Sequence, residues 1–151
     1  MGASAAPSSP SRLLLVDDNK LGLSARKVVL EELGYEVHTV LDAEDALALA
    51  ACHSFDLVIT DYKMPRMCGT EFIRRLREFR PAVPVVMISG FVDALGLDER
   101  NTGADAVISK SSNEVQHLIR TVRSLLKRAS SKKPAGSEGG PPRSGRRGAQ
   151  A

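Results

Sequence analysis

The chain has 151 residues, of which 42% are hydrophobic and 26% charged, a composition that predicts one globular domain. Its apolar runs fall short of the ~18 residues needed to cross a bilayer, and its two cysteines are too few for a disulfide framework, which excludes a membrane span and a secreted disulfide scaffold and predicts a cytoplasmic protein. The net charge of +3 is uneven, because residues 127–151 hold seven basic groups and one acid, while the remaining 14 basic and 17 acidic groups give the rest of the chain a net charge of −3.

Both ends of the chain are predicted to be disordered. Residues 1–11 are mostly small or polar, and residues 130–151 contain no Leu, Ile, Val, Phe, Met or Tyr. Such segments cannot bury enough apolar surface to offset the entropy lost on ordering. Residues 12–129 remain as the folded domain, which is long enough to form one core.

Within this domain, short apolar runs alternate with segments of helical spacing. Strands are predicted at residues 12–16, 36–40, 56–60, 84–88 and 105–109. The helix after the first strand is predicted to turn one apolar face inward, formed by Leu21, Ala25, Val28, Val29 and Leu33.

The later helices differ in how clearly the sequence predicts them. Asp42 is predicted to cap the second helix, and the third carries an apolar stripe that ends before Pro81. The fourth, near residues 93–101, is weak because Gly96 interrupts it, at a cost of about 1 kcal/mol relative to Ala. The last helix, after Ser111, has the clearest apolar face.

Strict alternation of five strands and five helices predicts an α/β fold, a doubly wound parallel sheet with helices on both faces. The first, third and fourth runs are almost entirely apolar, as strands buried on both faces are, whereas the second suits an edge. Ligands of such sheets bind beyond the carboxyl ends of the strands, at the point where the strand order reverses.

Chemically useful side chains follow four of the predicted strands. Alone, each has an ordinary explanation: a helix-start acid, a turn aspartate, a loop serine and glycine, or a surface lysine. Together they predict one site at the carboxyl edge of the sheet, formed by Asp17, Asp18, Asp61, Ser89, Gly90 and Lys110.

Three crowded carboxylates need a counter-charge, because like charges disfavour one another's ionised forms. Oxygen ligands without His or Cys select a hard cation, which points to Mg²⁺. A carboxylate beside this ion can attack phosphorus and form an acyl phosphate. Lys110 and the Ser89 hydroxyl would help to neutralise the phosphoryl oxygens, and Gly90 leaves room for the incoming group.

With these residues the chain resembles the receiver domain of bacterial two-component response regulators, from Leu13 to about Leu126. The resemblance is carried by residues 14–18 (LLVDD), residues 61–65 (DYKMP) with Gly69, residues 89–90 (SG), residues 103–104 (GA), and Lys110.

The resemblance implies a flavodoxin-like fold with strand order 2-1-3-4-5. It implies that Asp61 accepts a phosphoryl group from a phosphohistidine on a kinase or phosphotransfer protein. Mg²⁺ would be held by Asp17, Asp18, Asp61 and the backbone carbonyl of Lys63. Ser89 would move toward the phosphoryl group, and Lys110 would bridge to it.

The chain departs from the family at its usual output face. Val107 occupies the position of an aromatic switch residue, Ser111 stands where proline usually follows the bridging lysine, and the fourth helix is weak. Lys63 and Phe91 occupy positions that tune the lifetime of the phosphorylated form, and we hypothesise that they hinder the hydrolytic water.

These residues predict a stand-alone receiver that acts by protein contact rather than by turnover, with its kinase and downstream partner unidentified. One alternative is a Mg²⁺-dependent phosphohydrolase of the haloacid-dehalogenase type, although that family places its second aspartate two residues after the nucleophile. Another is a degenerate receiver used as a scaffold. An FMN-binding flavodoxin lacks support, since no phosphate loop follows the first strand.

The basic tail has two interpretations. It is a solvated extension, or an electrostatic tether that contacts nucleic acid, acidic proteins or anionic lipid weakly. It is too short for a helix-turn-helix, so we expect no sequence-specific DNA binding by this chain alone.

Overall fold

A single five-stranded parallel sheet organises the chain, and the computed structural model describes residues 9–132 of it. The order in the sheet is β2-β1-β3-β4-β5, which confirms the predicted fold class and strand order. The strands are β1 (Arg12–Val16), β2 (Glu36–Val40), β3 (Leu57–Asp61), β4 (Val85–Ser89) and β5 (Ala106–Ser109). Predicted strand positions hold to within one residue.

Helices occupy every connection between consecutive strands, and one follows the last strand. They are α1 (Lys20–Glu32), α2 (Ala43–Cys52), α3 (Gly69–Phe79), α4 (Val92–Leu95), α5 (Glu99–Thr102) and α6 (Glu114–Lys132). Asp42 caps α2 as predicted, by accepting a hydrogen bond from the Asp45 N–H at 2.8 Å.

The prediction of one weak fourth helix is wrong, because two single-turn helices occupy that connection. Gly96 lies between them rather than inside a helix. With φ at +63° it ends α4 in the left-handed conformation, which glycine adopts without steric cost. A new turn then begins at Asp98, whose side chain accepts hydrogen bonds from the Arg100 and Asn101 backbone.

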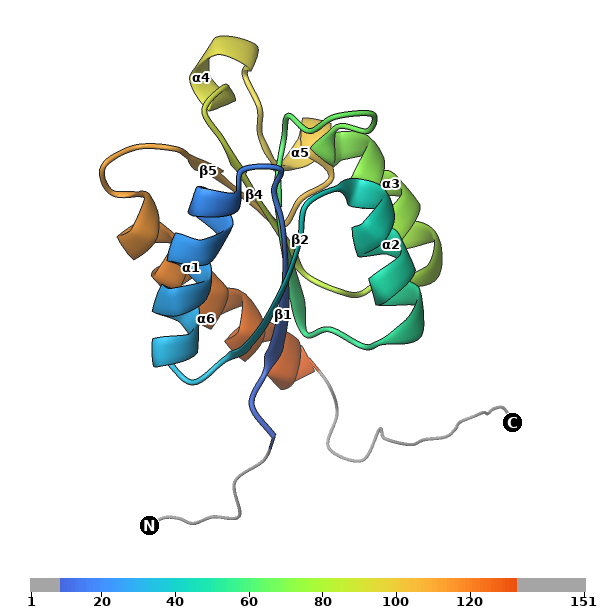
Figure 1. Ribbon diagram of the computed structural model, residues 1–151, viewed down its shortest axis with the longest axis vertical. Coiled ribbons are helices and arrows are strands. Elements are labelled where there is room, and N and C mark those ends of the chain that lie inside the picture. Colours follow the sequence, from blue (N-terminus) through green and yellow to red (C-terminus); the bar gives the residue numbers. More distant parts are fainter. Residues whose placement is uncertain (1–8, 133–151) are drawn as a thin grey trace.

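Helices cover both faces of the sheet (Figure 1). Helices α1 and α6 lie on one face, and α2 and α3 lie on the other. The strand pleat divides each buried strand between two cores, so that Leu13 and Leu15 pack toward α1 and α6, whereas Leu14 and Val16 pack toward α2 and α3. Strands β1, β3 and β4 are thereby buried on both sides.

The predicted inward face of α1 is wrong. Leu21 and Val28 are exposed, and the buried residues are Leu23, Arg26 and Leu30. Apolar residues occur on several sides of this helix, so spacing alone does not fix its rotation. Asn19 caps the helix directly after the end of β1 by accepting a hydrogen bond from the Gly22 N–H at 3.0 Å.

The ends of the domain lie away from the carboxyl edge of the sheet, at the start of β1 and the end of α6 (Figure 1). Helix α6 continues to Lys132, three residues into the segment predicted to be disordered. The remaining tail predictions concern residues 1–8 and 133–151, which lie outside the described residues. Within residues 9–132, no helix combines the length and apolar character that crossing a membrane requires.

Candidate metal centre

Three carboxylates meet where β1 and β3 end. Asp17 and Asp18 follow the last residue of β1, and Asp61 is the last residue of β3. Each offers one oxygen, and these three oxygens lie within 4.8 Å of one another. Asp17 and Asp61 are buried and Asp18 is exposed, so the cluster opens to solvent on one side.

Lys110 supplies the first positive charge of the cluster from the residue after β5. Its Nζ lies 3.2 Å from Asp61 Oδ2 and 4.0 Å from Asp17 Oδ2. The Lys110 backbone N–H donates to the Ser89 carbonyl at 3.0 Å, which continues the β4–β5 pairing and fixes where the side chain starts. The predicted convergence of these strand ends is therefore present in the structure.

Backbone groups hold two of the carboxylates in place. Tyr62 N–H donates to Asp61 Oδ1 at 2.7 Å, and Asn19 N–H donates to Asp17 Oδ1 at 3.0 Å. Gly69 N–H donates to the Tyr62 carbonyl at 2.6 Å and so ties the turn after β3 to the start of α3. Each buried carboxylate thus keeps one oxygen on the backbone and turns the other toward a cation.

Burial raises the pKa of Asp61, and the charge of Asp17 raises it further, while Lys110 and the Tyr62 N–H lower it in part. The folded protein therefore binds a proton at Asp61 more tightly than the unfolded chain does. Ionised Asp61 then costs stability, and this cost grows as pH rises from the usual carboxyl value through the raised pKa.

We predict that, without divalent metal, Asp61→Asn raises the free energy of unfolding at pH 7, because the variant removes this cost. The gain shrinks as pH falls toward the ordinary aspartate pKa, because wild-type Asp61 is then protonated in the folded state and takes up its proton in the unfolded chain as well. Urea unfolding of both proteins in EDTA at neutral and acidic pH measures the difference. A gain that is equal at both pH values would contradict this reasoning.

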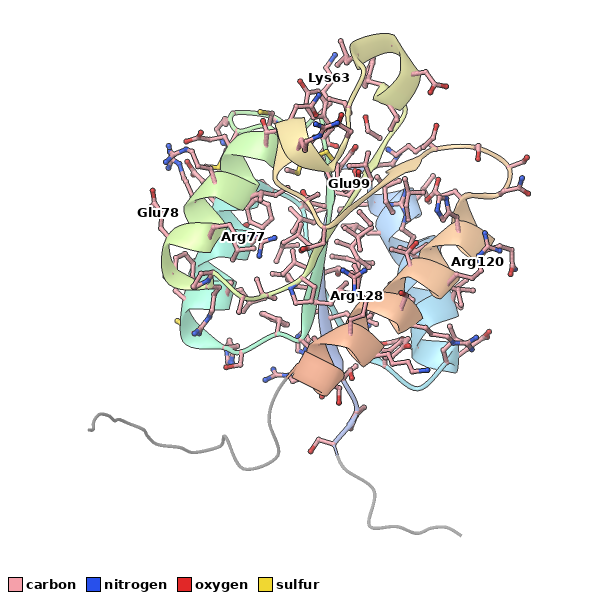
Figure 2. All side chains as sticks on the ribbon, turned by 180° about the vertical axis from the view of Figure 1, so that it is seen from behind. Lys63, Arg77, Glu78, Glu99, Arg120 and Arg128 are labelled. Atoms are coloured by element: carbon pink, nitrogen blue, oxygen red, sulfur yellow. The ribbon has the colours of Figure 1, made fainter. Side chains whose placement is uncertain are left out.

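A cavity of ≈490 Å³ opens over the cluster and is lined by the three aspartates, Lys63, Phe91 and Lys110, among others. Lys63 Nζ lies 5.3 Å from the centroid of the Phe91 ring, within the range of a cation–π contact. Figure 2 shows Lys63 at the end of the molecule where α4 lies. The two side chains border the space in which a ligand of the carboxylates would sit.

Three other predicted positions do not line this cavity. Ser89 is fully buried, and its Oγ accepts a hydrogen bond from the Phe91 N–H at 2.9 Å. Gly90 is exposed, and a Cβ built on it meets nothing within 4 Å. Val107 packs against the core cluster under α2 and α3, and its N–H donates to Glu99 Oε2 at 3.2 Å.

Arg26, a buried arginine of α1, belongs to the site although it was not among the residues predicted from the sequence. Its Nη1 donates to Asp17 Oδ2 at 3.0 Å, and its Nε donates to Glu114 Oε2 at 2.8 Å. Burial alone would lower the pKa of the guanidinium, but the hydrogen bonds and charges of Glu114 and Asp17 raise it above its ordinary value. The sequence did hold one indication that Arg26 is buried, because it lies three residues after Leu23 and four before Leu30, the other buried residues of α1.

The donor set fits Mg²⁺. All three side chains offer carboxylate oxygens, the oxygens are close enough to share one ion, and an exposed side leaves room for retained water. Within residues 9–132, this is the only group of three or more His, Cys, Asp or Glu residues placed to hold a metal.

A family model and similar curated proteins agree on one family. The family model described as "Response regulator receiver domain" matches residues 13–123. The chain is 32% identical over 123 residues to the polar-differentiation response regulator DivK of Brucella anthropi, covering 78% of this chain and 97% of that protein. It is 31% identical over 117 residues to the alkaline phosphatase synthesis transcriptional regulatory protein PhoP of Bacillus subtilis, covering 74% of this chain.

Coverage of these relatives differs. The chain spans 48% of PhoP and 15% of the gliding motility regulatory protein of Myxococcus xanthus, to which it is 32% identical over 121 residues and 76% of its own length. The match therefore covers a minor part of these two longer relatives and nearly all of DivK.

Solved structures share the fold. A CheY-like response regulator receiver domain protein from Methanospirillum hungatei JF-1 superposes with a TM-score of 0.75 at 31% identity, covering 82% of this chain and 99% of that one. The signal receiver domain of an HD domain-containing protein from Pseudomonas fluorescens Pf-5 gives 0.76 at 26% identity, with 86% and 96% covered.

Proposed function

Because this chain belongs to the response regulator receiver family, we propose that Asp61 accepts a phosphoryl group from a histidine kinase or a histidine phosphotransfer protein. The chain is a phosphoacceptor signalling module rather than a turnover enzyme. The observation that carries the proposal is the meeting of Asp17, Asp18 and Asp61 at the sheet edge, with Lys110 3.2 Å from Asp61.

Each side chain has a proposed part in the transfer. Asp17, Asp18, Asp61 and the Lys63 carbonyl would hold Mg²⁺, which when bound neutralises charge on phosphoryl oxygens. An Asp61 oxygen forms the new bond to phosphorus as the P–N bond of the phosphohistidine breaks, and the imidazole nitrogen keeps the electron pair. Lys110 neutralises the charge that builds on the phosphoryl oxygens, and Ser89 turns toward the phosphoryl group.

A titration followed by NMR tests the proposed site. We expect Mg²⁺, and then beryllofluoride as a phosphoryl mimic, to shift the backbone amides of Tyr62 and Lys110 in a saturable way. Residues at the opposite end of the sheet, such as Asp56, serve as the internal control. Spectra that do not change on either addition would favour a degenerate receiver that acts as a scaffold.

The competing phosphohydrolase function makes a different prediction. A haloacid-dehalogenase-type enzyme would turn over p-nitrophenyl phosphate repeatedly, whereas a receiver accepts one phosphoryl group per chain. Asp17 and Asp18 are adjacent, and Asp61 ends the third strand rather than the first. This arrangement supports the receiver, and the absence of steady-state turnover is the expected result.

We predict that Phe91→Ala and Lys63→Ala shorten the lifetime of the phosphorylated form. The Lys63–Phe91 contact borders the cavity over Asp61 and would hinder the hydrolytic water. A cation–π contact of about 0.5–1 kcal/mol corresponds to hydrolysis about 2- to 5-fold faster once it is lost. The loss of the phosphoryl group with time gives the rate.

Phe79→Ala is the matched control for this prediction. Phe79 is as exposed as Phe91, at 40%, and also lies near a cation, Arg80, but it is at the C-terminal end of α3 and does not line the cavity. Its removal should leave the lifetime unchanged. Equal lifetimes in the wild-type, Phe91→Ala and Lys63→Ala proteins would remove the hypothesis.

For output, we propose that the chain acts in the cytoplasm as a stand-alone receiver, through contact with another protein. The match to DivK, which covers 97% of the length of DivK, supports a receiver of this size. Val107 offers no aromatic ring to rotate, so the readout would not use the usual switch residue. The basic tail remains a proposed electrostatic contact, and deletion of residues 130–151 should weaken partner binding if it acts as a tether.

A further inference from the structure

A buried arginine links the acidic cluster to a distant helix. Arg26 is 9% exposed and lies on the inward face of α1. Its guanidinium bonds to Asp17 at one end of the cluster and to Glu114 in the first turn of α6, 88 residues away in sequence. Helices α1 and α6 cover the same face of the sheet (Figure 1), so this ion-pair chain crosses between them.

The local structure around Arg26 accommodates its guanidinium. Gly22 lies one helical turn earlier, and a Cβ built there would lie 3.3 Å from Arg26 Nη1, a tight contact. The planar fork donates through Nη1 to one carboxylate and through Nε to another at the same time. Lysine, a single ammonium on a flexible stem, does not reproduce this geometry.

The charge of Arg26 makes the environments of Asp17 and Glu114 depend on each other. Asp17 already has Arg26 at 3.0 Å and Lys110 at 4.0 Å. A divalent cation on Asp17 adds positive charge beside Arg26 and weakens its attraction to that carboxylate, while the attraction of Arg26 to Glu114 remains. Conversely, Glu114 offsets part of the Arg26 charge that would otherwise oppose a cation on Asp17.

We propose that Arg26 is a positioning residue for Asp17 and that, through Glu114, it couples occupancy of the metal site to the first turn of α6. The inference rests on the proposed Mg²⁺ site of the phosphoacceptor. It gives the site a mechanical link to α6 that does not pass through Val107. Occupancy of the metal site would then change the surface formed by α1 and α6.

An NMR experiment on the full chain tests this coupling with Mg²⁺ as the probe. Three signals are followed during titration: the Arg26 Nε–H, the Tyr62 amide at the site and the Val115 amide in α6. In the wild-type protein we expect all three to shift and to saturate at the same Mg²⁺ concentration. Calorimetry supplies the Mg²⁺ dissociation constant independently.

Two variants separate the link from the site. Glu114→Ala should weaken Mg²⁺ binding by roughly 3- to 10-fold, through the uncompensated Arg26 charge, and abolish the Val115 shift while the Tyr62 shift persists at saturation. Arg26→Lys should also lose the Val115 shift. Glu31→Ala is the matched control, because Glu31 is an exposed acid of α1 that pairs with Lys27 and, among residues 9–132, with no other cation.

The outcomes distinguish this inference from the proposed function. If Mg²⁺ shifts Tyr62 but leaves Arg26 Nε–H and Val115 in place, the coupling is wrong and the metal site stands. The coupling is also wrong if Glu114→Ala behaves like Glu31→Ala in affinity and shifts. If Mg²⁺ shifts none of the three signals, the metal site itself is absent and both proposals fail.

Discussion

Asp61→Asn is expected to abolish phosphoryl transfer to this protein completely, whether the donor is a histidine kinase or acetyl phosphate. The amide has nearly the same shape as the carboxylate, so the turn after β3 should keep its structure. It lacks the negative charge and the nucleophilic oxygen that an acyl phosphate requires. Labelling with a radioactive phosphodonor in Mg²⁺ measures the effect.

Asp56→Asn is the matched control for this loss. Asp56 directly precedes β3, at the opposite end from Asp61, and its Oδ2 accepts a hydrogen bond from the Arg12 backbone at 2.7 Å. The control should be labelled like the wild-type protein. Persistent labelling of the Asp61→Asn protein would mean that another residue is the phosphoacceptor.

Gly69→Ala is expected to have the second largest effect, on stability and on the site together. A Cβ at this position would overlap the backbone carbonyl oxygen of Asp61 and lie 2.9 Å from Met87 Cε and 3.1 Å from Tyr62 Cα. Backbone cannot move aside as a side chain does, so the turn that carries Asp61 must shift. We expect a loss of about 1–3 kcal/mol in the free energy of unfolding, together with weaker Mg²⁺ binding.

Gly90→Ala provides the comparison, because the same change near the same site meets nothing within 4 Å. Urea denaturation and Mg²⁺ titration of both variants give the two quantities. Gly90→Ala should retain wild-type affinity for Mg²⁺. If Gly69→Ala is as stable and binds Mg²⁺ as well as the wild-type protein, the close approach of Gly69 to Asp61 does not constrain the site.

The sequence was sufficient to predict the sheet and its polar edge. Buried strands such as residues 13–16 are continuous apolar runs, and the side chain after each run is placed at the carboxyl edge by the strand itself. Asp17, Asp18, Asp61 and Lys110 therefore converge as soon as the strands are parallel. The strand order came from the family resemblance rather than from periodicity.

The burial of Arg26 and the end of α4 at Gly96 could not be predicted, because they depend on the rotation of a helix and on the conformation of a connection. Helix α1 has apolar residues on several sides, and the predicted inward face did not include Arg26, which the structure buries. Its burial is tolerated because two carboxylates from different parts of the chain meet it, and no local pattern encodes such a meeting. Gly96 was likewise predicted to interrupt one helix, whereas in the structure it ends α4 in the left-handed conformation.

Intact mass measurement after incubation with acetyl phosphate is the most direct test of whether three aspartates gather around one ion and leave Asp61 free to react. With Mg²⁺ present, we predict that the full chain gains the mass of one phosphoryl group, located in the peptide that contains Asp61. With EDTA in place of Mg²⁺, we predict no gain. An unchanged mass in Mg²⁺, or a phosphoryl group on a different residue, would contradict the proposed site.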